Sequence, residues 1–152
     1  MKKIVTGIAA FLVGAMCLAG CGKTVELNVA DVADGVLSSV TFNEYLEPVS
    51  QDIEVKRLGL DEALVEECAA YAGTKAVVDE IAVLKTTDAQ KALEQVEAYV
   101  ASQKESYASY KPDEIIKLDD CVIKTVGDYV IYVASADNAT AQSVVDRLTT
   151  VE

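Results

Sequence analysis

The sequence contains no histidine and no tryptophan, and only two of its 152 residues are proline. Histidine is the commonest general base and the commonest neutral metal ligand, so its absence argues against zinc chemistry and against a triad-based hydrolase. The chain also lacks a P-loop, a G-x-S-x-G nucleophile motif and a dinucleotide-binding fingerprint. We therefore expect a protein that is not an enzyme and that carries no metal ion or cofactor.

Positive charge is scarce. The chain has 13 lysines and arginines against 25 aspartates and glutamates, a formal net charge of −12. Lys2 and Lys3 lie in a leader without acidic residues, so the remaining chain carries 11 basic and 25 acidic residues, a net charge of −14. Such a surface favours solubility, and it repels nucleic-acid phosphates and anionic lipid headgroups. We expect no nucleic-acid partner, and a membrane association that needs a covalent anchor.

The apolar run near the N-terminus is shorter than a membrane span. Ile4 to Leu18 is free of charge and follows the basic pair Lys2-Lys3, whereas a spanning helix needs about 20 apolar residues. A short basic region followed by such a run is typical of a secretory signal peptide. The sequence therefore predicts a signal peptide over residues 1–20.

The end of this leader has the pattern of a lipidation site. The run Leu18-Ala19-Gly20-Cys21 resembles the lipobox of bacterial lipoproteins, in which small residues precede a cysteine that receives a diacylglyceryl group. Cleavage would leave lipidated Cys21 as the first residue, and several acyl chains give stable anchoring where one is marginal. We expect residues 21–27 to be a short tether and the protein to be exported to the outer face of the cytoplasmic membrane. The alternatives are an ordinary signal peptide with a chance cysteine and an uncleaved anchor.

Residues 28–152 are expected to form one α+β domain, since their composition is globular and no repeat or low-complexity tract interrupts them. Apolar residues recur at helical spacing over about 29–40, where Asn28 is a suitable cap. The alternation of Ile53 and Val55 with charged residues predicts a short half-buried strand.

Patterns in the middle of the chain predict two helices and a strand between them. The first helix is expected over 62–71 and would end at Gly73. Residues 75–85 are apolar on both faces, which predicts a central strand. Thr87 would cap a long helix that Pro112 ends, with one apolar stripe that packs across a sheet; coiled-coil pairing of that stripe is the weaker alternative.

The last part of the chain predicts a hairpin between helical segments. Gly127-Asp128 separates two β-rich runs, which is a strong signal for a two-residue hairpin turn. The elements expected here are a helical turn over 113–118, strands over 121–126 and 129–134, and a helix that Asp137 or Asn138 caps. The fold class is therefore α+β: a small, mainly antiparallel sheet of about three to four strands, with a long helix and two to three shorter helices packed on it.

Two cysteines remain after the leader and the lipobox are set aside. Cys68 is expected on a helix and Cys121 at the start of a strand. A disulfide between them is chemically permitted in an exported protein, and buried free thiols are also consistent with their apolar surroundings. The sequence leaves both alternatives open.

Three segments of the chain resemble a family of small Gram-positive lipoproteins that contain a domain of unknown function (domain of unknown function four-three-five-eight). They are the run from Val78 to Lys85, the end of the long helix at Ser109-Tyr110-Lys111-Pro112, and the hairpin run Gly127-Asp128-Tyr129-Val130. The resemblance implies an exported, lipid-anchored α+β domain. It implies no activity, ligand or catalytic residue.

The candidate contact residues are the carboxylates Asp79 and Glu80 and the tyrosines Tyr107 and Tyr110. A carboxylate on a sheet face can bind a ligand or act as an acid of raised pKa, and tyrosines can line a groove for a glycan or peptide. The competing interpretation is structural: ion pairs for the carboxylates, and core packing with the hydroxyl at the rim for the tyrosines.

The resulting functional prediction is a lipid-anchored envelope protein that binds an envelope protein, peptide or glycan, with no catalytic residue. Two other classes stay open: an enzyme of cell-envelope material built on carboxylates, and a structural assembly subunit.

Overall fold

A computed structural model describes residues 24–150. Residues 1–20, with the lipobox residues Leu18, Ala19 and Gly20, lie outside the described residues, as does Cys21; their predicted roles stay predictions. Within residues 24–150, no helix combines the length and the apolar character that a membrane crossing requires.

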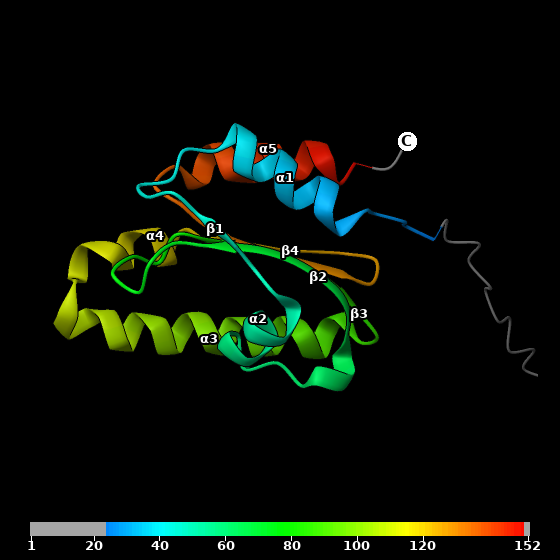
Figure 1. Ribbon diagram of the computed structural model, residues 1–152, viewed down its shortest axis with the longest axis horizontal. Helices are drawn as coiled ribbons and strands as arrows, with labels where there is room; N and C mark the ends of the chain where they lie inside the picture. Colours follow the sequence, from blue (N-terminus) through cyan, green and yellow to red (C-terminus); the bar gives the residue numbers. More distant parts are fainter. Residues whose placement is uncertain (1–23, 151–152) are drawn as a thin grey trace, which may run out of the picture.

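The domain consists of one antiparallel sheet with helices on both faces (Figure 1). The strand order is β1-β2-β3-β5-β4, with the bounds Glu47–Val49 (β1), Val65–Ala72 (β2), Glu80–Thr86 (β3), Val122–Val126 (β4) and Tyr129–Ala134 (β5). The predicted α+β class is confirmed, but the sheet has five strands rather than three to four. The difference arises because β1 and β2 lie in segments where we expected no strand of this sheet.

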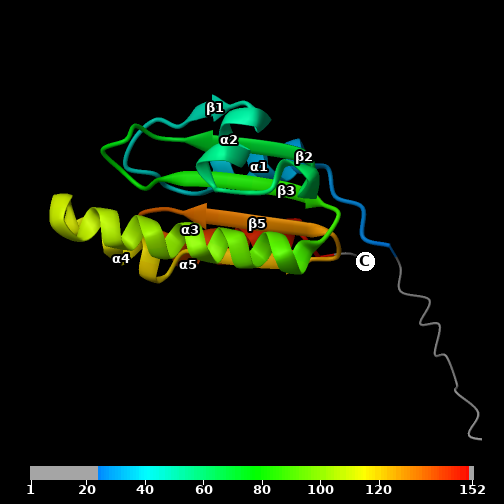
Figure 2. The ribbon, with the colours of Figure 1, turned by 90° about the horizontal axis from the view of Figure 1, so that it is seen from below.

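The two faces of the sheet carry separate apolar cores. Helices α1 (Val29–Ser39) and α5 (Asn138–Leu148) pack on one face, and α2 (Gln51–Arg57) and α3 (Ala89–Tyr110) on the other. Figure 2 shows α3 running along the strands with α2 beside it. Side chains alternate along β3 and β5, so each central strand contributes to both cores, which explains why it is apolar on both faces.

Capping residues and Pro112 set three helix boundaries where the sequence predicted them, and a fourth boundary is one residue off. Asn28 accepts hydrogen bonds from the amides of Ala30 and Asp31 and starts α1. Pro112 follows α3 and opens a short 3₁₀ turn (Pro112–Glu114) before α4 (Ile115–Asp119). Asp137 caps α5. The cap of α3 is Asp88 rather than Thr87, one residue later than expected.

The hairpin prediction was also correct. Gly127 has φ of 56°, a left-handed conformation that glycine adopts without strain and that two-residue hairpin turns require. Gly35 lies inside α1, where it allows close packing: a Cβ there would lie 2.8 Å from Cδ1 of Leu148. The missing side chain therefore allows α1 to approach α5.

Two predicted elements were wrong because their local periodicity was ambiguous. Ile53 and Val55 lie in helix α2, not in a strand, with Val55 buried and Ile53 exposed. The segment expected as a helix over 62–71 is a 3₁₀ turn (Glu62–Leu64) followed by β2, so Cys68 lies on a strand. Hydrogen bonding of β2 to strands on both sides outweighs the weak helical pattern.

The predicted central strand is correct in place but too long. Strand β3 begins at Glu80, and residues 75–79 belong to the segment that connects β2 to β3. This segment, residues 73–79, lies at the end of the sheet where α3 also ends (Figure 1).

Candidate functional site

A cavity of about 420 Å³ opens between the connecting segment 73–79 and the C-terminal half of α3. Its walls combine tyrosine rings, small polar groups and four charged side chains. The lining residues are Arg57, Ala72, Gly73, Thr74, Lys75, Val77, Val78, Asp79, Glu80, Tyr99, Gln103, Ser106, Tyr107 and Tyr110. Mixed aromatic and polar walls of this kind are typical of small-molecule sites.

Glu80 and Arg57 form an ion pair at the base of this cavity. Nη1 of Arg57 donates a hydrogen bond of 3.1 Å to Oε1 of Glu80, and the Tyr99 hydroxyl donates one of 2.8 Å to Oε2. Glu80 is 3% exposed, whereas the Arg57 side chain is 33% exposed. Both carboxylate oxygens are therefore engaged, and the guanidinium is the part of the pair that is accessible from solvent.

A second carboxyl group, Glu54, lies behind Arg57 on the buried side. Its Oε2 is 3.7 Å from Nε of Arg57 and the side chain is fully buried. Among the described residues, neither oxygen of Glu54 has a hydrogen-bond partner. Burial, and then the negative charge of nearby Glu80, raise the pKa of Glu54 to about 9. Glu54 therefore carries a proton at neutral pH. Burial also raises the pKa of Glu80, but the charge of Arg57 and the hydrogen bonds from Tyr99 and Arg57 favour its ionised form, so Glu80 is the carboxylate that balances Arg57.

Local structure explains how these groups meet. Glu54 and Arg57 are three residues apart on α2, which places them on the same side of a helix. Glu80 opens β3 with its side chain on the face that α2 and α3 cover. Tyr99 comes from the middle of α3, and its ring meets the ring of the buried Tyr132 edge to face at 6.0 Å. Side chains from two helices, α2 and α3, thus converge on one carboxylate of β3.

Tyr107 connects α3 to the wall of the cavity. Its single hydroxyl proton is shared between two carbonyl oxygens, that of Lys75 at 2.9 Å and that of Val77 at 3.1 Å. Tyr110 follows one turn later, 69% exposed, with its ring 6.0 Å from that of Tyr107. Tyr107 therefore holds the connecting segment, while Tyr110 offers an open ring at the mouth of the cavity.

Asp79 belongs to a different buried cluster. Nζ of Lys117 donates to Oδ1 of Asp79 at 2.8 Å and to Oε2 of Glu114 at 2.9 Å. Oδ2 of Asp79 accepts from the amide of Asn43 at 2.7 Å, and Glu114 accepts from the amide of Val78 at 3.0 Å. This cluster ties the connecting segment to α4 and to the loop before β1.

The charges of this cluster stabilise one another. Burial disfavours the charge on Lys117, but its hydrogen bonds to Asp79 and Glu114 outweigh burial and raise its pKa. For Glu114, the hydrogen bonds from Val78 and Lys117 outweigh burial and lower its pKa. Lys117 and Glu114 therefore remain ionised at neutral pH, and the cluster acts as a fixed anchor of the connecting segment.

The two cysteines are free thiols on the α3 face of the sheet, each partly buried. Burial raises the pKa of Cys68 to about 12 and also raises that of Cys121. Thiolates, not thiols, are reactive, so neither side chain is an activated nucleophile.

The structure brings all four candidate contact residues to one cavity. Asp79, Glu80, Tyr107 and Tyr110 line it. Asp79 and Tyr107 hold the connecting segment that forms the wall. Glu80 orients Arg57, and the ring of Tyr110 is exposed to solvent. Within residues 24–150, no group of three or more acidic or cysteine residues is arranged to hold a metal ion.

Sequence reasoning missed the partners of these residues. Glu54 and Arg57 were not singled out, because their segment was read as a strand. Their three-residue spacing, in a segment that follows the potential helix cap Ser50, is the signal that would have predicted a helix here. Glu114 and Lys117 also have helical spacing, but the contact of Lys117 with Asp79 spans 38 residues and leaves no mark in the local sequence.

A family model described as a domain of unknown function (DUF4358) matches residues 39–135. The chain belongs to the DUF4358 family. The matched region begins at the end of α1 and ends just after β5, so it contains the whole sheet, the cavity and both buried charge clusters. The DUF4358 match confirms the resemblance drawn from the sequence. No curated protein and no solved structure matches the chain.

Proposed function

We propose that this protein is a lipid-anchored binding module of the cell envelope, which holds part of an envelope peptide or glycan in the cavity between α3 and residues 73–79. One observation carries the proposal: a preformed cavity whose base is a guanidinium fixed by a buried carboxylate and whose walls are tyrosines. Preorganised polar groups among aromatic walls give orientation and specificity to a bound ligand.

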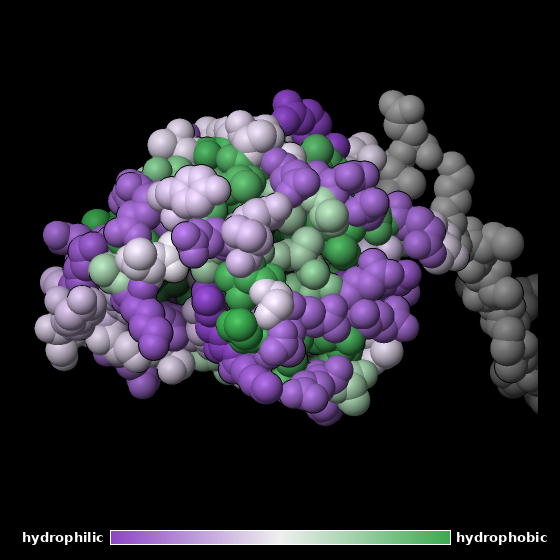
Figure 3. Space-filling model, in the orientation of Figure 1, coloured by the Kyte–Doolittle hydropathy of each residue, from purple (hydrophilic) through white to green (hydrophobic). Residues whose placement is uncertain are grey.

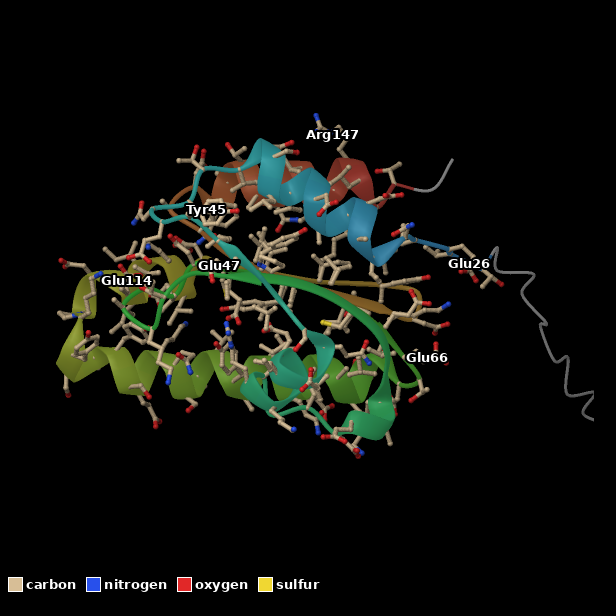
Figure 4. All side chains as sticks on the ribbon, in the orientation of Figure 1. Glu26, Tyr45, Glu47, Glu66, Glu114 and Arg147 are labelled. Atoms are coloured by element: carbon tan, nitrogen blue, oxygen red, sulfur yellow. The ribbon has the colours of Figure 1, made fainter. Side chains whose placement is uncertain are left out.

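The position of the cavity suits a module that is tethered at its N-terminus. A Cβ on Gly127 would lie 3.2 Å from Val25, and Glu26 is 3.8 Å from Lys85, so the first described residues lie by the hairpin turn. Glu80 begins β3 at the other end, which is about 20 Å away for a strand of this length. Figure 4 shows Glu26 and Glu114 at opposite ends of the domain. A lipid on Cys21 would therefore leave the cavity facing away from the membrane.

The chemistry of the carboxylates supports binding over catalysis. An enzyme that uses two carboxyl groups needs both within reach of the substrate. Here both oxygens of Glu80 are engaged by Arg57 and Tyr99, and Glu54 is fully buried and does not line the cavity. The pair fits the task of positioning Arg57.

The surface also supports binding over assembly. The exposed large apolar side chains of the described part are Tyr45, Ile53, Tyr110 and Ile116, each on a different segment. On the face drawn in Figure 3, hydrophilic residues surround scattered hydrophobic ones. A subunit that assembles through the long helix would instead present a continuous apolar surface.

Two experiments test the two halves of the proposal. For anchoring, the variant Cys21→Ser should leave the membrane fraction and lose the mass of the acyl chains. Membrane retention at unchanged mass would contradict lipidation of Cys21.

For binding, a photoreactive amino acid at Gln103, which lines the cavity, should crosslink to an envelope peptide or glycan in intact cells. The matched control is the same group at Ala101, which is exposed on α3 but does not line the cavity. Equal crosslinking from both positions, or none from Gln103, would count against the cavity as the binding site.

A further inference from the structure

The guanidinium of Arg57 has unused hydrogen-bonding capacity that faces the cavity. An arginine has five N–H donors in a planar fork. Among the described residues, the guanidinium donates one hydrogen bond, from Nη1 to Glu80, while Nε lies 3.7 Å from Glu54 on the buried side. The side chain is 33% exposed and lines the cavity. Donors therefore remain for a group that enters from solvent.

The position of this guanidinium is set before any ligand arrives. Glu80 holds Nη1 and is itself held by the Tyr99 hydroxyl at 2.8 Å. Such a guanidinium loses little conformational entropy when it binds a planar anion, and a carboxylate matches its fork with two parallel hydrogen bonds.

The charges around the cavity favour an anionic group in spite of the acidic chain. Four charged side chains line the cavity: Arg57, Lys75, Asp79 and Glu80. Glu80 balances Arg57, and Asp79 is paired with Lys117 outside the lining. Lys75 makes no ion pair within residues 24–150, so the cavity carries one excess positive charge in a protein whose formal net charge is −12.

We propose that the ligand presents a carboxylate to Arg57, with the rest of its body packed against the tyrosine wall formed by Tyr107 and Tyr110. This inference rests on the proposed function, because it names the ligand chemistry of the same cavity. Such a carboxylate occurs at the C-terminus of a peptide and on an acidic sugar, and both offer apolar faces that stack on tyrosine rings.

The test compares each acid with its neutral counterpart on the unaltered full-length protein in detergent. The peptide probes are N-acetyl-alanyl-alanine and its C-terminal amide, and the sugar probes are glucuronic acid and glucose. Binding is followed by ligand-observed saturation-transfer NMR. We expect at least one acid to bind about tenfold more tightly than its neutral counterpart, as the loss of a charge-assisted bidentate contact predicts. The pair that shows the difference identifies the source of the carboxylate.

Variants then assign the effect to the guanidinium. Arg57→Lys keeps the charge that Glu80 needs but removes the fork, so it should abolish most of the acid preference while thermal unfolding confirms that the domain stays folded. Lys56→Gln is the control: Lys56 is the exposed neighbour on α2 and does not line the cavity, so its variant should bind like the parent protein. Three results would each overturn the inference. Either the neutral probes bind as tightly as both acids, or neither acid binds, or Lys56→Gln loses as much acid preference as Arg57→Lys. The Gln103 crosslinking experiment tests the cavity independently of the ligand's charge.

Discussion

Replacing Glu54 with glutamine should stabilise the folded protein at neutral pH, although Glu54 lies beside Arg57 and could be taken for its ion-pair partner. Glu54 is fully buried, and its pKa in the folded protein is about 9 against an ordinary value of 4.5. At pH 7 the unfolded chain releases this proton and the folded chain keeps it. Folding is therefore coupled to proton uptake at this site, and the coupling disfavours the folded state.

The sign and size of the effect follow from the two pKa values. Below the ordinary value of 4.5 both states hold the proton, so the site costs nothing there. As the pH rises toward about 9, the folded protein loses about 1.4 kcal/mol of stability per pH unit at this site. This gives a cost of about 3 kcal/mol at neutral pH, which a neutral isostere avoids.

The assay is thermal or urea unfolding of parent and Glu54→Gln proteins across pH. The advantage of the variant should grow by about 2–3 kcal/mol between roughly pH 5.5 and 7.5, since the titrating group is gone. Glu66→Gln is the matched control, because Glu66 is exposed on β2 and its loss should leave the pH profile of the parent unchanged. Parallel profiles for the parent and Glu54→Gln proteins would refute a protonated Glu54.

Two further predictions concern the connecting segment. Lys117→Met should destabilise the fold by about 3 kcal/mol in urea unfolding, because it leaves the carboxylates of Asp79 and Glu114 buried without their shared cation; a loss below about 1 kcal/mol would show that water replaces the lysine. Tyr107→Phe should cost about 1–2 kcal/mol, because it removes the hydroxyl proton that two main-chain carbonyls share, and it should speed amide exchange within residues 73–79. Unchanged exchange in that segment would contradict a role for Tyr107 in holding it.

The accuracy of the sequence predictions depended on how local the deciding interactions are. Helix α1 begins where Asn28 caps it, α3 ends where Pro112 forbids further helix, and the hairpin turns at Gly127. In each case the responsible groups lie within a few residues of the feature they decide. Such features can be read from a single sequence.

Strand β2 shows the opposite case. Its residues follow a pattern that fits one side of a helix about as well as a strand, and only its neighbours decide. Antiparallel pairing with β1 and β3 satisfies its backbone groups on both edges, and these partners lie too far along the chain for a local pattern to reveal. The same holds for α2, whose buried face becomes defined only when it packs on β2.

From the sequence alone follow the predicted leader with its lipidation cysteine, the family membership, the α+β class and the four residues Asp79, Glu80, Tyr107 and Tyr110 that prove to share one cavity. Tertiary structure alone decides that Arg57 lines the cavity with free hydrogen-bond donors, while both oxygens of its partner Glu80 are engaged. The contact between Arg57 and Glu80 joins a helix and a strand 23 residues apart. Burial raises the pKa of both neighbouring carboxyl groups, and the hydrogen bonds that Glu80 accepts from Arg57 and Tyr99 decide that Glu80 is the one that keeps its charge. Desolvation depends on everything packed around a group, so no local pattern encodes it.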